Sequence, residues 1–252
     1  MGAKTGVLAF VDGDAGPLLR QRPVASAELT PALIERLYPG YRIEPDGQRD
    51  LWEAVYPPDD MVYALSVPGL DLACDRRFMV DRPSELPAHL LQLGAGRRML
   101  LHAMHSVVDW LAFAIWDDGV LVRSLSLSPG EGIMENIGAP LPFEESYWAG
   151  AHPVEPMPGW PAEGPYPLPF HPLDLGEEAL RHLFGFVLEG RPEPNDVPAH
   201  QIGLPGFRVT DPTGAEQAQR EASLQAARET MGQPRFFQYR DGRMVEVSLD
   251  DL

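Results

Sequence analysis

The longest apolar segment of the chain runs from residue 99 to residue 116, and four polar residues interrupt it: His102, His105, Ser106 and Asp109. Polar groups in an apolar segment need hydrogen-bond partners once they are buried. As a helix, the segment would place these four side chains on one face, at i, i+3, i+4 and i+7. As a strand, it would place His102 and His105 on opposite faces. Its β-branched and aromatic residues favour the strand.

A hairpin follows directly, formed by residues 110–116 and 120–127 around Asp117, Asp118 and Gly119. Aspartate followed by glycine supplies the positive φ angles of tight hairpin turns. A two-residue loop would pair Asp117 with Val120, and a three-residue loop with a bulge at Gly119 would pair Trp116 with Val120. We favour the second register because it gathers five apolar side chains on one face: Leu111, Phe113, Ile115, Leu121 and Leu125. The opposite face then holds Trp110, Ala112, Ala114, Trp116, Ser124 and Ser126.

The rest of the pattern predicts a single α+β domain over residues 1–210. Short apolar runs bounded by turn residues predict strands over residues 7–11, 41–44 and 61–67. Capping residues and helical periodicity predict helices over residues 31–38, 84–93 and 175–189, the last of them ended by Gly190. We expect a mixed or mainly antiparallel sheet with the helices on one face. Residues 211–252 are predicted to be an appendage of one polar helix and a hairpin that turns at Asp241 and Gly242.

Ten prolines are interleaved with aromatic residues between Pro140 and Pro172. Proline fixes φ and lacks an N–H donor, which disfavours helix and central strand. Disordered linkers are poor in aromatic residues. We therefore predict a long loop that covers the domain and buries its rings: Tyr147, Trp148, Trp160, Tyr166 and Phe170.

Composition narrows the function without defining it. The 252-residue chain is 44% apolar and 23% charged, which is typical of a globular protein. Cys74 is its only cysteine, and no signal peptide or membrane span is predicted, so we expect a cytoplasmic protein. The net charge of -17 disfavours nucleic acid and suits basic proteins or cations as partners.

Two sets of residues could bind a divalent metal such as zinc. The first is His102, His105 and Asp109, if the segment is helical. The second is Asp12 and Asp14 in VLAFVDGD, which resembles the aspartate pair that ends the first strand of haloacid-dehalogenase-like phosphatases. That resemblance implies that Asp12 attacks phosphorus and Asp14 moves the proton. The chain departs from the family at Gly16, where threonine or valine is usual, and its only lysine precedes the motif.

A catalytic triad is a further interpretation, in which Ser124 or Ser126 would act with His105 and Asp109. The nucleophile-elbow motif of α/β-hydrolases is absent from the sequence, and serines that alternate with leucines are ordinary in a hairpin. A binding surface on the hairpin and the aromatic loop is the broader hypothesis. Its candidate residues are His102, His105, Asp109, Trp110, Ser124, Ser126, Trp148 and Trp160.

Several segments across roughly residues 1–210 resemble an uncharacterised family of actinobacterial proteins. They are MGAKTG near the start, YPP at 56–58, the LLHAMHSVVDWLAF run, RSLSLSP at 123–129, PYPLPFHPL at 165–173 and FGFVLEGRPEP at 184–194. The resemblance implies no activity and no catalytic residues, because the family has no established function.

Three functions follow as hypotheses. The first is a cytoplasmic, non-catalytic binding or regulatory protein for a small molecule or a protein, because no catalytic motif meets its structural requirements. The second is a metal-dependent, phosphatase-like hydrolase that uses the His/Asp residues. The third is an acidic inhibitor or immunity-type protein for a basic partner.

Overall fold

The structure is a computed structural model, and it describes residues 2–154, 166–230, 236–240 and 243–247. By their internal contacts the residues form two compact units. The first comprises residues 1–154 and 167–210, and the second comprises residues 155–166 and 211–252.

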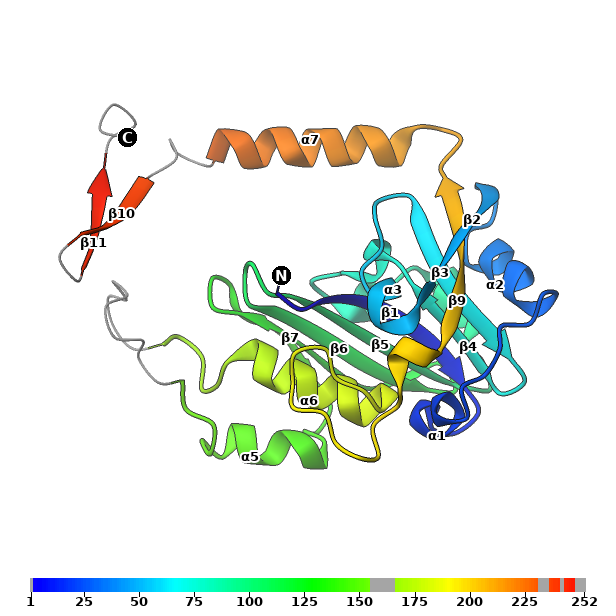
Figure 1. Cartoon of the computed structure of the whole chain (residues 1–252), viewed down its shortest axis with the longest axis horizontal. Helices are drawn as coiled ribbons and strands as arrows, with labels where there is room; N and C mark the ends of the chain where they lie inside the picture. The colour runs from blue at the N-terminus through cyan, green and yellow to red at the C-terminus, as the bar shows by residue number, and fades with distance from the viewer. Residues whose placement is uncertain (1, 155–165, 231–235, 241–242, 248–252) are drawn as a thin grey trace. The chain divides into compact units, whose positions relative to one another are not determined.

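A nine-stranded sheet forms the first unit, and every pair of neighbouring strands is antiparallel. The strand order is β2-β9-β3-β4-β1-β5-β6-β7-β8 (Figure 1). The strands are β1 (Lys4–Val11), β2 (Arg42–Asp50), β3 (Met61–Val67), β4 (Leu70–Cys74), β5 (Arg98–His105), β6 (Trp110–Asp117), β7 (Val120–Ser128), β8 (Gly132–Ile137) and β9 (Gly203–Thr210). The predicted α+β fold with a mainly antiparallel sheet is confirmed.

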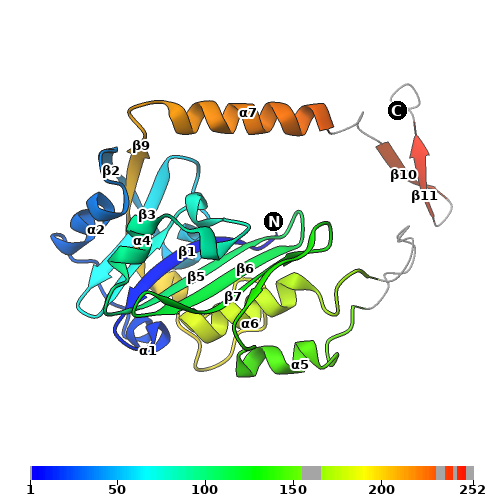
Figure 2. The same cartoon turned by 180° about the vertical axis from the view of Figure 1, so that it is seen from behind.

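Helices cover both faces of this sheet, whereas the sequence pattern predicted them on one face. The α-helices of the unit are α1 (Ala15–Arg20), α2 (Leu29–Leu37), α3 (Leu51–Ala54), α4 (Ala88–Leu93), α5 (Glu145–Trp148) and α6 (Pro172–Phe184). Helices α2 and α4 pack on the face that carries Leu101 and Trp116. Helix α6 lies on the other face, across β5 and β6 (Figures 1 and 2), where His102 contacts its backbone. The expectation was wrong because a central sheet with two apolar faces needs cover on both.

Two helix boundaries differ from the prediction for local reasons. Residues 84–93 form a 3₁₀ turn, η2 (Pro83–Glu85), and then α4, because Pro87 disfavours a helical conformation at Leu86. Helix α6 ends at Gly185, whose φ of 83° is left-handed, and not at Gly190. The apolar residues beyond it belong to a loop whose backbone N–H groups bind Glu177.

The register predicted for the hairpin is also wrong. Asp117 pairs with Val120 and Trp116 pairs with Leu121, so the loop has two residues. A bulge at Val122 then shifts the register by one residue, and Leu121 lies on the Trp116 face and not with Phe113. The bulge restores the rest of the predicted grouping: Ser124 and Ser126 share the face of the even-numbered residues of β6.

Residues 140–154 and 167–172 of the proline-rich segment belong to the first unit. They contain a further 3₁₀ turn, η3 (Pro142–Glu144), and the short helix α5, which forms where no proline interrupts the chain. Tyr147 and Phe170 are buried and their rings meet edge to face, which agrees with the predicted burial of rings. Trp160 lies outside the described residues.

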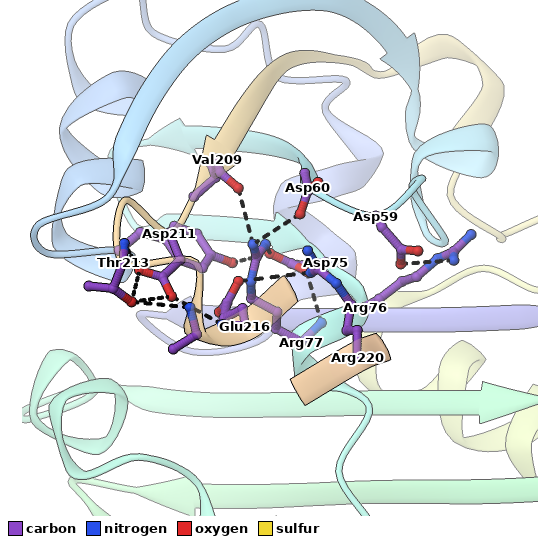
Figure 3. A network of polar contacts seen from close by, with 12 residues as sticks. Asp59, Asp60, Asp75, Arg76, Arg77, Val209, Asp211, Thr213, Glu216 and Arg220 are labelled. Atoms are coloured by element: carbon purple, nitrogen blue, oxygen red, sulfur yellow. Dashed lines mark hydrogen bonds and ion pairs between the residues drawn. The ribbon is translucent and has the colours of Figure 1, made fainter. Parts of the chain in front are cut away.

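The second unit contains helix α7 (Ala215–Thr230) and the strands β10 (Phe236–Arg240) and β11 (Arg243–Val247), which pair antiparallel. Before α7, the carboxylate of Asp211 accepts hydrogen bonds from the backbone N–H groups of Thr213 and Glu216 (Figure 3). The Thr213 hydroxyl also donates to this carboxylate, and it lowers the pKa of Asp211 most, followed by the two backbone N–H groups. In the described part of the chain, no helix is long and apolar enough to cross a bilayer.

Candidate functional site

His102 is buried on β5 with both ring nitrogens bonded. Nε2 lies 2.9 Å from the carbonyl oxygen of Gly176, so it carries the proton, and Nδ1 accepts from the Thr5 hydroxyl at 2.8 Å. Burial lowers the pKa of His102 to about 4, against a small opposing effect of the Gly176 hydrogen bond. His102 is therefore a neutral, fully satisfied core histidine.

The segment from Met99 to His105 is a strand, so the predicted histidine cluster does not form. His105 lies on the face opposite His102, and Asp109 lies in the β5–β6 turn with a φ of 47°. Asp109 faces His171, whose Nε2 is 3.6 Å from Oδ2. Within the described residues, no three histidine, cysteine or acidic side chains are grouped to hold a metal ion.

Asp12 and Asp14 lie after the opposite end of β1, where arginines pair with them. Arg97 Nε is 2.7 Å from Asp12 Oδ1, and Arg98 Nη1 is 3.1 Å from Asp14 Oδ1. The carboxylate side chains are 62% and 74% exposed. Because Lys4 pairs with His105, Asp12 lies eight residues along the chain from the position opposite His105, a separation of about 26 Å. The structure does not bring the two predicted metal sets together.

The two candidate serines on β7 are buried but differ in their partners. Ser124 donates its hydroxyl to Glu135, which also accepts from Ser84. Ser126 Oγ has no hydrogen-bond partner among the residues that the structure describes. Neither serine bonds to His105 in that part of the chain, so the predicted triad is not assembled.

Trp148 has a structural role. Its indole Nε1 donates to Glu144 at 3.1 Å, and its ring meets Phe170 at 5.0 Å. Glu144 is itself paired with Arg123 in the core. This candidate residue therefore belongs to the contacts that hold α5 in place.

An open groove lies over the face that carries Trp110, at the end of the sheet where β5 turns into β6. Its volume is about 680 Å³. We call it the Trp110 groove, and it is lined by Met79, Asp81, Arg82, His105, Val108, Trp110, Ser128, Gly130, Glu131 and Met134. Two of the predicted binding residues, His105 and Trp110, thus lie in one groove.

The apolar wall of this groove is built by close packing. Trp110 packs with Ala103 and Ala112, and the thioethers of Met79 and Met134 pack against them. Gly6 allows the Met79 segment to approach β1, because a Cβ there would lie 2.4 Å from the Asp75 carbonyl oxygen. Methionine and tryptophan give an adaptable apolar surface.

Two buried polar atoms on this face lack partners. The indole Nε1 of Trp110, a side chain 6% exposed, and the hydroxyl of Ser126 have none within the described residues. A buried donor without an acceptor costs about 1–3 kcal/mol, and native proteins keep few of them. Trp110 Nε1 belongs to a residue that lines the groove, so an acceptor bound there could satisfy it.

A row of paired residues crosses three strands at this end of the sheet. Lys4 on β1 lies opposite His105 on β5, and His105 lies opposite Trp110 on β6. Directly opposed residues of antiparallel strands share a face, and each strand spacing is about 4.8 Å. The Lys4 and Trp110 positions are therefore about 10 Å apart on one face.

Cationic side chains gather around Tyr56 beside this row. The Lys4 ammonium is 5.3 Å and the Arg76 guanidinium 4.1 Å from the ring centroid of Tyr56, and the His105 ring is 6.0 Å away. Arg76 Nη1 also pairs with Asp59 at 3.0 Å (Figure 3). The Nε of Arg76 is buried without a partner among the described residues.

His105 is held neutral with one donor available. Partial burial lowers its pKa, and the positive charges of Lys4 and Arg76 lower it further. The backbone N–H of Val107 donates to Nδ1 at 3.3 Å, so the proton of the neutral ring is on Nε2.

Sequence reasoning missed most of the groove and the residues around Tyr56 beside it. Lys4, Tyr56, Arg76, Met79 and Arg82 come from β1 and from the loops around β3 and β4. They meet β5 and β6 only because the sheet order inserts β1 between β4 and β5. The one available signal was that the only lysine of an acidic chain lies at the start of a strand.

The fold and the groove define an α+β chain with an antiparallel sheet and an open site at one end of it. The chain belongs to a family of unknown function (DUF6928), whose model matches residues 5–207. The resemblance of its segments to an uncharacterised family is thereby confirmed. No curated protein and no solved structure matches the chain.

Proposed function

We propose that this chain is a non-catalytic binding protein and that its ligand is a small molecule held in the Trp110 groove. The observation that carries the proposal is the indole Nε1 of Trp110, a buried donor without a partner in the described residues, on a side chain that lines the groove. A ligand acceptor would remove the cost of that unpaired donor and would bury the apolar wall around it.

Binding is favoured over catalysis by the contacts of the polar side chains. His105 Nδ1 accepts from a backbone N–H group, and Ser124 donates to Glu135, so neither is paired as base and nucleophile. The residues of the metal-hydrolase hypothesis lie on different faces and at different ends of the sheet. A cytoplasmic location and an inhibitor role toward a basic protein stay predictions from the sequence.

Titration with a matched eight-carbon series tests the proposal: octanoate, 1-octanol and octylammonium. The readout is the indole N–H signal of Trp110 in a ¹H–¹⁵N NMR spectrum, assigned by its loss in Trp110→Phe. We expect at least one compound to shift this signal in a saturable manner, because its apolar chain would displace water from the groove.

Gly130→Phe is the blocking variant, because no atom lies within 4 Å of a Cβ built there, so the ring can enter the groove without disturbing the core. Val120→Phe is the matched control on the hairpin turn, where Val120 is 67% exposed. Binding should be lost in the first variant and kept in the second. If no compound shifts the Trp110 signal, or if Gly130→Phe binds as the wild type does, the proposal is wrong.

A further inference from the structure

Buried and partly buried side chains in the Trp110 groove and beside it offer hydrogen-bond donors. Trp110 Nε1 and Arg76 Nε carry hydrogen and can only donate, and both lack partners in the described part of the chain. His105 also offers a donor, because its Nδ1 is occupied by the N–H of Val107. A ligand that satisfies these groups must bring acceptor atoms.

The charge at this end of the sheet differs from that of the rest of the chain. The chain has a net charge of -17 and a single lysine. That lysine, Lys4, lies over Tyr56 beside Arg76 and has no carboxylate within 4 Å among the described residues. Arg76 pairs through Nη1 with the exposed carboxylate of Asp59. The row from Lys4 through His105 to Trp110 therefore starts at a positive charge.

The groove also has two carboxylates, and their position limits their effect. Asp81 and Glu131 line it together with Arg82, and all three side chains are exposed to solvent. Exposed charges are screened and can turn toward water. Trp110 is buried, and Lys4 and His105 are partly buried, so electrostatic interactions with these residues are screened less.

From this arrangement we infer that the ligand is an amphipathic anion with an apolar body and a carboxylate-type head group. The apolar body packs on Trp110, Met79 and Met134. The head group lies toward Lys4 and Arg76 and accepts from His105 Nε2. The separation of about 10 Å between the Lys4 and Trp110 positions matches the length of a short acyl chain or a ring system. This inference rests on the proposed function and specifies its ligand class.

The same eight-carbon series tests the head group, because its members differ only in charge. In the wild type we expect octanoate to bind at least about tenfold more tightly than octylammonium, with 1-octanol between them, since only octanoate brings a charged acceptor for the donors at Lys4 and His105. Titrations follow the Trp110 indole signal at constant ionic strength.

Lys4→Gln should weaken octanoate about tenfold and leave 1-octanol unchanged, and Lys4→Arg should restore octanoate binding. Arg42→Gln is the control for net charge, because it removes one exposed cation from β2, at the other edge of the sheet. Unchanged affinities in this variant would show that the effect at Lys4 is local.

The outcomes distinguish failure of this inference from failure of the proposed function. If the three compounds bind equally, or if octylammonium binds best, the anionic head group is wrong. If Gly130→Phe blocks that binding, the groove is still the binding site. Binding of none of them would overturn both. A Lys4→Gln variant that binds octanoate as the wild type does would also overturn the assignment of the head group to Lys4.

Discussion

The two faces of the β6–β7 hairpin differ in how completely their buried polar groups are hydrogen-bonded. On the face that packs against Phe113, Arg123 and Glu144 form a bidentate pair at 2.6 and 2.8 Å, and both side chains are 0% exposed. Arg123 also donates to the side chain of Asn136 and the carbonyl of Ile137. On the other face, Ser124 donates to Glu135, but Trp110 Nε1 and Ser126 Oγ are buried without partners in the described residues.

This difference distinguishes the structural face of the hairpin from the face of the proposed binding site. Glu144 accepts from Arg123, from Trp148 and from the backbone of Leu141, so it fixes η3 and α5 against the sheet. In a network where each buried group has a partner, no donor or acceptor remains for a ligand to bind. The unpartnered groups on the Trp110 face keep their hydrogen-bonding capacity, which is what a binding site requires. The comparison can be tested by removing one group at a time.

The largest expected effect on stability is on the face that carries the Arg123–Glu144 pair. Glu144→Gln removes the negative charge that compensates buried Arg123, so we expect the free energy of unfolding to fall by about 3–5 kcal/mol. Urea denaturation measures it, with Glu145→Gln as control because Glu145 is exposed and adjacent. The double change Arg123→Met, Glu144→Leu should recover much of the loss. A loss below about 1 kcal/mol for Glu144→Gln would contradict a buried ion pair.

The next effect concerns His102, a satisfied group on the same side of the sheet. The unfolded chain takes up a proton near pH 6.5, whereas burial holds the folded pKa at about 4. Between these values the unfolded state binds more protons, so stability is complete above pH 6.5 and falls as the pH falls toward 4. The shift is equivalent to about 3 kcal/mol.

His102→Gln isolates this contribution, since glutamine keeps an N–H that can donate to the Gly176 carbonyl. The difference in unfolding free energy between wild type and variant should shrink by about 3 kcal/mol from pH 7 to pH 4. Parallel curves for the two proteins would show that His102 is not protonated on unfolding in this range.

The smallest expected effect on stability comes from two serines of the same strand. Ser124 and Ser126 are both buried on the same face of β7, but only Ser124 has a partner. Ser124→Ala should destabilise the protein by about 1–3 kcal/mol, because Glu135 loses a donor. Ser126→Ala should be neutral or stabilising by about 1 kcal/mol. Equal losses in thermal or urea unfolding would mean that Ser126 is satisfied in the folded protein.

Local pattern explains what could be predicted from the sequence. The strands at 7–11 and 61–67 and the hairpin around Gly119 follow from apolar runs and turn residues, which act over a few positions. The wrong register near the turn has a local cause as well: the extra residue is at Val122 and not at Gly119, and both positions are compatible with the sequence. The end of α6 was predicted at Gly190, but the helix ends at Gly185, and local pattern does not distinguish the two glycines.

The site could be predicted only in part. His105 and Trp110 were candidates because polar or aromatic residues stood out in an apolar run, and both line the groove. His102 and Trp148 had the same signal, but the structure gives them partners in the core. A residue type shows that a partner is needed, and it does not show whether the chain supplies that partner.

The sequence by itself determined the fold class, the strand character of Met99–His105 and the acidity of the chain, because these depend on periodicity and composition. Only the tertiary structure decided that β1 lies between β4 and β5, which sets Lys4 opposite His105 and brings Arg76 and Met79 to the Trp110 face. Strand order depends on contacts between residues about one hundred positions apart. Those contacts are chosen by the packing of the whole sheet, and no local pattern encodes them.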